Sequence, residues 1–337
     1  MTDTTWSTRF SGRHVMVTGA TGFLGSNLTT HLLDHGAKVS TLVPEHEFGA
    51  VVAPAPRFEE VTVQVGTIAD YAAVDQLIRD QQVDTVFHLA AIATTTVAHY
   101  NPRQAFDTNI QGTYNILEAC RVNDVARVVV ASSDKAYGNG PHLPYTEDMP
   151  MAGQGTYDVS KSCADLLARS YHTGYGLPVA VGRYGNIFGE CDLHWSRLIP
   201  GTIRRLHHGQ APVVRQAAAG PFSRDFLYVA DAVTSYLAMA AALDAGHGAG
   251  QAYNFAMGLN LQPVDVVRRI QHLMGRQDIQ PVPAPSQPGE IAHQQIANDK
   301  AARTLDWTPA WTLDEGLART VDWYRTYLTR TGLGPII

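Results

Sequence analysis

The sequence predicts an α/β fold, in which a doubly wound parallel sheet is followed by a smaller mixed lobe. Apolar runs with strand character alternate with amphipathic helical segments from residue 14 to residue 183. This alternation is typical of a parallel sheet that helices cover on both faces. A glycine-rich turn follows the first apolar run, and Pro and Gly become more frequent from residue 184 onward. We therefore expect two units, residues 1–184 and 185–337, that interleave in part.

The expected elements follow from these patterns in chain order. We expect strands at residues 14–18, 39–43, 58–65, 83–89, 127–132 and 178–183. Helices are expected between them at residues 26–34, 72–80, 102–123 and 157–175. The second unit is expected to hold helices at residues 198–208, 229–243, 264–274, 298–305 and 313–329. The Pro-rich stretch at 280–288 is typical of a surface loop.

Composition excludes several classes of protein. Of the 337 residues, 45% are hydrophobic and 17% are charged, which fits a globular chain and not a disordered one. The net charge is −6 without a long basic run, so we expect no nucleic-acid partner. The three cysteines lack CxxC spacing and no histidine group has a ligand pattern, so we expect no metal. The chain shows neither a signal peptide nor a membrane span, and we expect a cytoplasmic location.

The glycine turn predicts a dinucleotide site. Gly19, Gly22 and Gly25 come directly after the first strand and open the first helix. In such a turn one glycine permits the bend, a second lets the backbone approach a pyrophosphate, and a third lets helix and strand pack closely. Glu45 follows the second strand and no Arg or Lys stands beside it, which favours NAD over NADP. We expect the cofactor to contact Gly19, Thr21, Gly22, Phe23, Leu24 and Gly25.

Two further motifs predict a reaction centre. Tyr157 and Lys161 are four residues apart on a predicted helix and so share one face. A lysine there can lower the pKa of the phenol, and a tyrosinate can take a proton from a hydroxyl as hydride leaves the same carbon. Ser133, Asp134 and Lys135 follow a buried strand, and ligands of open α/β sheets bind beyond such carboxyl ends. These five residues are the candidate catalytic group, with Ser133 as a hydrogen-bond donor to the reacting oxygen.

Together these motifs resemble the extended short-chain dehydrogenase/reductase family of nucleotide-sugar epimerases and dehydratases. The resemblance runs through TGATGFLG at 18–25, HLAA at 88–91, SSDKAYG at 132–138, YDVSK at 157–161, GRYGNIFG at 182–189 and RDFLYVADAV at 224–233. It implies a Rossmann-type NAD domain, a lobe for a nucleotide diphosphate sugar, and a homodimer through the helices at 102–123 and 157–175. It also implies cofactor contacts from Leu89, Ala90, Ala91, Asn109, Tyr157 and Lys161. The implied substrate contacts are Thr94, Asn186, Arg197, Leu198, Arg215, Arg224 and Glu290.

Within this family, Asp134-Lys135 is similar to the acid–base couple of the CDP-glucose 4,6-dehydratases and of the inverting UDP-GlcNAc 4,6-dehydratases, whereas 4-epimerases carry no such couple. The implied cycle oxidises C4 of the hexose while Tyr157 takes the hydroxyl proton. Lys135 then removes the C5 proton, Asp134 protonates the departing 6-hydroxyl, and hydride returns to C6. We therefore expect an NAD-dependent NDP-hexose 4,6-dehydratase that makes a 4-keto-6-deoxy sugar nucleotide. An NDP-sugar 4-epimerase is the alternative. A non-catalytic dinucleotide-sensing or scaffold protein is a third possibility, and net oxidation or reduction of a sugar with free cofactor exchange is a fourth.

The arginines depart in part from the family pattern. Gln287 stands where the family often has an arginine that binds the diphosphate, and Arg215 is a candidate to replace it. Arg224 matches a family diphosphate contact. If it binds no phosphate, Arg224 is expected to pair with Asp225 or Asp231.

Overall fold

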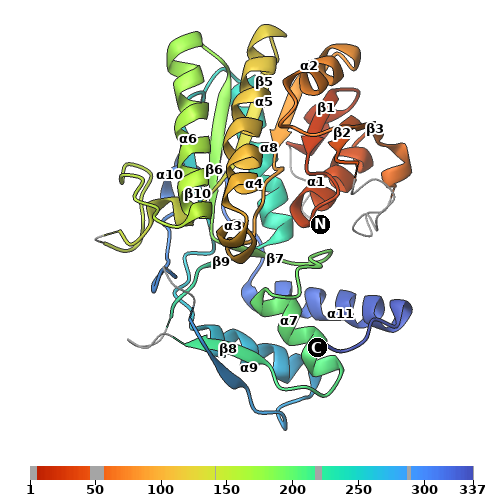
Figure 1. The fold of residues 1–337 in the computed structure, drawn as a ribbon, viewed down its shortest axis with the longest axis vertical. Helices are drawn as coiled ribbons and strands as arrows, with labels where there is room; N and C mark the ends of the chain where they lie inside the picture. Colours follow the sequence, from red (N-terminus) through yellow and green to blue (C-terminus); the bar gives the residue numbers. More distant parts are fainter. Residues whose placement is uncertain (1–5, 46–56, 141, 217–221, 287–289, 337) are drawn as a thin grey trace.

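The computed structural model describes residues 6–45, 57–140, 142–216, 222–286 and 290–336. Seven parallel strands form the central sheet, and helices cover both of its faces (Figure 1). In sheet order the strands are β3 (Thr62–Val65), β2 (Lys38–Val43), β1 (His14–Thr18), β4 (Thr85–His88), β5 (Arg127–Ser133), β6 (Val179–Tyr184) and β10 (Ala252–Phe255). This arrangement confirms the predicted α/β class with a doubly wound parallel sheet.

The sheet is buried because its strands are apolar on both faces. Helices α1 (Phe23–Asp34) and α8 (Val229–Asp244) pack on one face, and α2 (Tyr71–Asp80), α5 (Gly112–Val122) and α6 (Thr156–Tyr175) pack on the other. In β5, Val129 belongs to the core on the α1 and α8 side, whereas Val128 and Val130 belong to the opposite core. Successive side chains of a strand point to opposite faces, so one apolar run supplies both cores.

The strand order reverses between β1 and β4. The chain runs outward from β1 through β2 to β3, then returns across the sheet to β4 and runs outward to β6. Two neighbouring strands therefore send their connections in opposite directions, and a crevice opens beyond their carboxyl ends. Ligands of such sheets bind in this crevice.

The second lobe is smaller and largely helical. Helices α7 (Leu198–His207), α9 (Pro263–Met274) and α11 (Leu313–Thr331) pack around a third core. Two short parallel sheets accompany them, one of β7 (Asn186–Phe188) with β9 (Phe226–Tyr228) and one of β8 (Val213–Gln216) with β11 (Val282–Pro285). Helix α3 (Thr95–Tyr100) packs against α6, and α10 (Asp299–Leu305) packs against β10 (Figure 1).

Several predicted elements are corrected by the structure. The Pro-rich stretch at 280–288 is not wholly a loop, because β11 pairs there with β8. The stretch at 58–65 begins with a short 3₁₀ turn, and only Thr62–Val65 is a strand. The helix expected at 102–123 is α4 (Pro102–Phe106), a π-helical turn at Asp107–Gln111, and α5. The first helix begins at Phe23, three residues earlier than expected.

Strand β10 lies in the main sheet although it comes late in the chain. It pairs in parallel with β6, and α8 packs on the same sheet. Elements from both predicted units, 1–184 and 185–337, thus share one sheet. None of the helices in the described part of the chain combines the length and the apolar run that a membrane crossing requires.

Candidate active site

A cavity of about 1840 Å³ lies beyond the carboxyl ends of the central strands, between the sheet and the second lobe. Residues that follow β1, β4, β5 and β6 line one side of it, and residues of α7, β8 and the loop before β9 line the other. Every predicted site residue lines this cavity except Asn109 and Asp134. The fold therefore brings together side chains that are spread over more than 250 positions of the sequence.

The glycine turn forms one end of the cavity, and its geometry fits a dinucleotide. Gly19 has a φ of 73°, and a methyl group there would meet the backbone of Ala90 at 3.0 Å. A methyl group on Gly25 would lie 2.0 Å from the carbonyl oxygen of Gly19. The three glycines thus let the β1–α1 turn fold tightly, with the first turn of α1 directed at the cavity. A helix N-terminus so exposed is a binding site for phosphate.

The walls beside the turn extend this groove. Pro44 and Glu45 after β2, and Thr67 after β3, line the cavity. These residues lie at the carboxyl edge of the sheet, on the side of β1 that is away from Tyr157. The groove thus runs past the ends of three strands before it reaches the reaction centre, as an extended dinucleotide requires.

Asn109 and His88 lie behind the cavity wall that follows β4 and hold it through buried hydrogen bonds. Asn109, in the π-helical turn, accepts a hydrogen bond from the amide of Ile92 at 2.8 Å and donates one to Ser160 Oγ at 2.9 Å. His88 hydrogen-bonds Thr18 and Thr113, and burial, aided by the charge of Lys161, lowers its pKa to about 3. His88 is therefore neutral, and Asn109 holds the loop after β4 to α6 without facing the cavity.

Tyr157 and Lys161 lie on the first turns of α6, beside Ser133 at the end of β5. Burial lowers the pKa of the Lys161 ammonium to about 8, and its Nζ donates to the carbonyl of Ala131 at 3.0 Å. Burial raises the pKa of Tyr157 to about 12, although a hydrogen bond with Ser133 and the charge of Arg197 act in the opposite direction. Ser133 and Arg197 therefore both favour the Tyr157 phenolate in this structure.

Asp134 and Lys135 occupy the 3₁₀ turn that follows β5. The Asp134 side chain is fully buried, accepts from Ser133 Oγ at 3.1 Å, and has no partner for Oδ2 among the described residues. Lys135 Nζ lies 3.3 Å from Asp134 Oδ1 and 3.2 Å from Asn186 Oδ1. Lys135 lines the cavity, whereas Asp134 lies behind it. The predicted acid and base are thus in contact, but only the base faces the cavity directly.

Arginines line the side of the cavity that the second lobe forms. Arg197 pairs with Asp192 at 3.0 Å, and Arg224 pairs with Glu290 at 3.0 Å. The expected partners of Arg224, Asp225 or Asp231, are therefore wrong. The predicted departure at Gln287 lies outside the described residues.

Two of the cavity arginines have no counter-charge among the described residues. In the part of the chain that the structure describes, neither Arg205 nor Arg215 makes a hydrogen bond or ion pair through its guanidinium. Sequence reasoning missed Arg205, because it is one of two adjacent arginines on α7 and only the packed helix shows which of them faces the cavity. Unpaired guanidinium groups in a concave site favour an anionic ligand.

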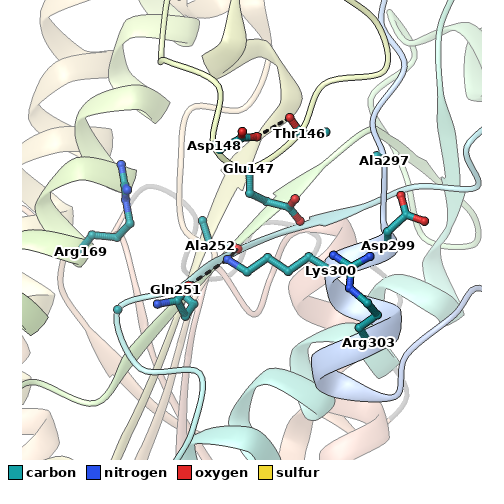
Figure 2. A pocket seen from close by; sticks show the side chains of 11 residues that line it. Thr146, Glu147, Asp148, Arg169, Gln251, Ala252, Ala297, Asp299, Lys300 and Arg303 are labelled. Carbon is teal, nitrogen blue, oxygen red and sulfur yellow. Dashed lines mark hydrogen bonds between the residues drawn. The ribbon is translucent and has the colours of Figure 1, made fainter.

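A second cavity, of about 540 Å³, lies between β10, α6 and α10 and is separate from the first (Figure 2). Side chains of both charges line it, including Glu147, Arg169 and Lys300. Lys300 donates to Gln251 Oε1 and to the carbonyl of Ala252, both at 2.9 Å. No predicted site residue lies there. The described residues also hold no group of three or more His, Cys, Asp or Glu side chains placed to bind a metal ion.

The chain is similar to known proteins over almost its whole length. The chain is 29% identical to the CDP-glucose 4,6-dehydratase of Salmonella typhimurium over 95% of this chain and 92% of that protein. It is 31% identical to the low-salt glycan biosynthesis protein Agl12 of Haloferax volcanii, over 92% of this chain and 98% of that protein.

Solved structures of an epimerase and a dehydratase are also similar to this chain over almost its whole length. The epimerase Mth375 of Methanothermobacter thermautotrophicus superposes with a TM-score of 0.88 at 27% identity, covering 97% of this chain and 96% of that one. DesIV, a dTDP-glucose 4,6-dehydratase of Streptomyces venezuelae solved with NAD bound, gives 0.84 at 27% identity, covering 94% and 98%. Residues 15–256 match the family described as the NAD dependent epimerase/dehydratase family. With its glycine turn, its Tyr157/Lys161 pair and this match over most of its length, the chain belongs to the NAD-dependent epimerase/dehydratase family, and NAD is its cofactor.

Proposed function

We propose that this protein is an NDP-hexose 4,6-dehydratase, which converts a nucleotide diphosphate hexose into its 4-keto-6-deoxy derivative with loss of one water. The observation that carries the proposal is the contact between Asp134 and Lys135 beside Tyr157, because elimination of water needs an acid and a base in addition to the group that oxidises C4. The dehydratases among its relatives support the same reaction.

The cofactor would lie along the groove from the glycine turn to Lys161. The residues of the turn would hold the pyrophosphate, with Ala90 and Ala91 on the opposite wall, and Lys161 would hold the ribose beside the nicotinamide. Bound NAD would accept hydride from C4 and return it to C6. NAD would therefore be regenerated in each turnover, so the reaction would need no added cofactor.

Each proton transfer of this reaction is assigned to a residue of the site. Tyr157 takes the proton of the 4-hydroxyl, with Ser133 donating a hydrogen bond to the same oxygen. Lys135 takes the C5 proton, which the 4-ketone acidifies. Asp134 gives a proton to the 6-hydroxyl, which leaves as water, and a proton returns to C5 as hydride reaches C6. The hexose loses one oxygen and two hydrogens, so the steps balance.

The arginine-lined side would hold the nucleotide diphosphate. Arg224 and Arg215 are suited to the diphosphate oxygens, and Asn186, which lies 3.2 Å from Lys135 Nζ, lines the same cavity. For Arg224 to bind phosphate, its ion pair with Glu290 would have to open. The Glu290 carboxylate lines the cavity and could then accept a hydrogen bond from a sugar or ribose hydroxyl.

A 4-epimerase is the second candidate, and one observation favours it. Asp134 is fully buried and does not line the cavity, so proton delivery to a 6-hydroxyl requires a small movement of the turn that follows β5. An epimerase needs no such movement, because Tyr157 alone exchanges the proton of the 4-hydroxyl.

Mass spectrometry of the product separates the two functions. The protein is incubated with CDP-, dTDP-, UDP- and GDP-hexoses without added cofactor. Loss of one water from any of them supports the dehydratase, whereas a new sugar of unchanged mass supports the epimerase. Lys135→Met and Asp134→Asn should abolish water loss, while Lys38→Met, an exposed lysine far from the cavity, should retain it. Full dehydration by either of the first two variants would refute the assigned roles.

We also propose a homodimer through α5 and α6. Their outer surfaces expose Tyr114, Leu166 and Tyr175, which are 41%, 51% and 66% accessible. Exposed large apolar side chains are typical of surfaces that bind another protein. Light scattering should give twice the chain mass, and Leu166→Asp should reduce it to one chain.

A further inference from the structure

A short segment of the chain lies along α7 without forming helix or strand. We call residues 333–336 the strap; the C mark lies beside α7 in Figure 1. Arg204 donates from Nε and Nη2 to the carbonyl of Gly334 at 2.9 and 2.6 Å, and His208 Nε2 donates to the carbonyl of Leu333 at 2.8 Å. Gln210 and Ile336 exchange two hydrogen bonds, at 3.1 and 3.3 Å. Side chains of and just beyond α7 therefore fix the strap's path.

The strap ends on the wall of the large cavity. Ile336 lines that cavity together with Leu198, Thr202 and Arg205. These three residues of α7 are spaced by four and three positions, so they share one face of the helix. Val213 of β8 lines the same end. This wall belongs to the second lobe, whereas the glycine turn belongs to the sheet (Figure 1).

The chemistry of this wall is that of a nucleoside site. Ile336, Leu198 and Val213 present apolar surface, which suits the face of a planar base. Arg205 supplies several N–H donors, and its guanidinium has no ionic partner among the described residues. Apolar walls with a few convergent polar groups are typical of small-molecule sites.

We propose that the strap and Arg205 close the nucleoside end of the substrate cavity and discriminate between bases. This inference rests on the proposed function, in which Arg215 and Arg224 hold the diphosphate and the nucleoside extends beyond them along α7 and β8. The strap is fixed by side-chain hydrogen bonds to its carbonyls and not by a strand ladder. Such a segment opens and closes locally without disturbing the fold.

Binding calorimetry tests the proposal with CDP, dTDP, UDP and GDP as probes and NAD as the internal reference. The full chain is compared with a chain that stops after Gly332 and with Ile336→Gly, which keeps the backbone hydrogen bonds to Gln210 but removes the apolar wall. Each change should weaken the affinity for the nucleotide that binds most tightly by roughly tenfold, because it removes the contact of about one buried side chain. It should also reduce the differences in affinity among the four nucleotides. NAD affinity should not change. Arg330→Lys, on the exposed end of α11, is the matched control and should bind as the full chain does.

Arg204→Lys gives an independent test. It keeps the positive charge but cannot donate from two nitrogens to the strap, and Arg204 itself does not line the cavity. It should weaken nucleotide binding in the same direction as the shortened chain.

The outcomes separate the two proposals. If the full chain binds none of the four nucleotides, the proposed function and the strap's role are both wrong. If it binds one of them and Ile336→Gly leaves affinity and discrimination unchanged, the strap's role is wrong and the proposed function stands. If the shortened chain also loses its affinity for NAD, its fold is damaged. The nucleotide affinities of Ile336→Gly then decide whether the strap has the proposed role.

Discussion

The buried charge of Lys161 should destabilise the folded protein at neutral pH. Replacing Lys161 by an uncharged residue should therefore raise the free energy of unfolding. Its side chain is 5% exposed, and burial lowers the pKa of its ammonium from 10.5 to about 8. At pH 7 the lysine is charged in both the folded and the unfolded chain, so folding must bury a charge. The penalty is complete below pH 8, declines as the pH rises from 8 toward 10.5, and vanishes when the lysine is neutral in both states.

The magnitude follows from the two pKa values. A shift from 10.5 to about 8 corresponds to about 3 kcal/mol of unfavourable free energy at pH 7. Lys161→Met removes this penalty but also removes the hydrogen bond to the carbonyl of Ala131, which contributes about 1 kcal/mol. The variant should therefore be more stable than the parent by about 2 kcal/mol at pH 7. By pH 10 the two chains should be about equally stable.

Urea denaturation at pH 7, 8, 9 and 10 measures the difference, with the free energy of unfolding extrapolated to water. The tyrosines and carboxylates make the same contribution to the pH dependence of unfolding in both chains, so they cancel in the difference. Lys38→Met, which removes an exposed lysine instead of a buried one, is the matched control. If the difference between Lys161→Met and the parent stays constant from pH 7 to pH 10, burial does not perturb Lys161 and the reasoning fails.

Two further predictions follow from buried contacts. Asp165→Asn should lower the free energy of unfolding by about 3 to 5 kcal/mol, because it leaves the guanidinium of Arg183 buried without its counter-charge. Chemical denaturation measures this loss, and replacing both residues by apolar ones should recover much of it; a single variant as stable as the parent would contradict the prediction. Gly25→Ala should abolish NAD binding in fluorescence titrations, because the added methyl would lie 2.0 Å from the carbonyl oxygen of Gly19. Gly174→Ala, where a methyl meets nothing within 4 Å, should bind NAD normally, and intact binding by Gly25→Ala would show that the turn tolerates a side chain.

Much of the fold could be predicted from local patterns. The apolar run of β5 and the helical spacing of Tyr157 and Lys161 lie within single elements, so neighbouring residues are sufficient to identify them. The β1–α1 turn was likewise predictable, since only glycine fits at Gly25. These same elements carry the cofactor groove and half of the candidate reaction centre.

Other features depend on contacts between distant segments. Strand β10 has four residues, and it is a strand because β6 offers an unpaired edge far away in the sequence. The pairing of Arg224 with Glu290 joins residues 66 positions apart, whereas the sequence suggested the nearest acids. Asp134 and Lys135 are adjacent in sequence, yet the turn after β5 buries the first and exposes the second to the cavity.

The sequence by itself determined the fold class, NAD as the cofactor and the chemical groups that meet at the sheet edge, because periodicity, glycine geometry and side-chain chemistry are local properties. The tertiary structure alone decided which of those groups face the cavity. Arg205 and Ile336 were not predicted, since no local pattern distinguishes Arg205 from Arg204 or marks residue 336 as part of a site. Packing of α7 against the rest of the second lobe orients them, and packing depends on the whole chain.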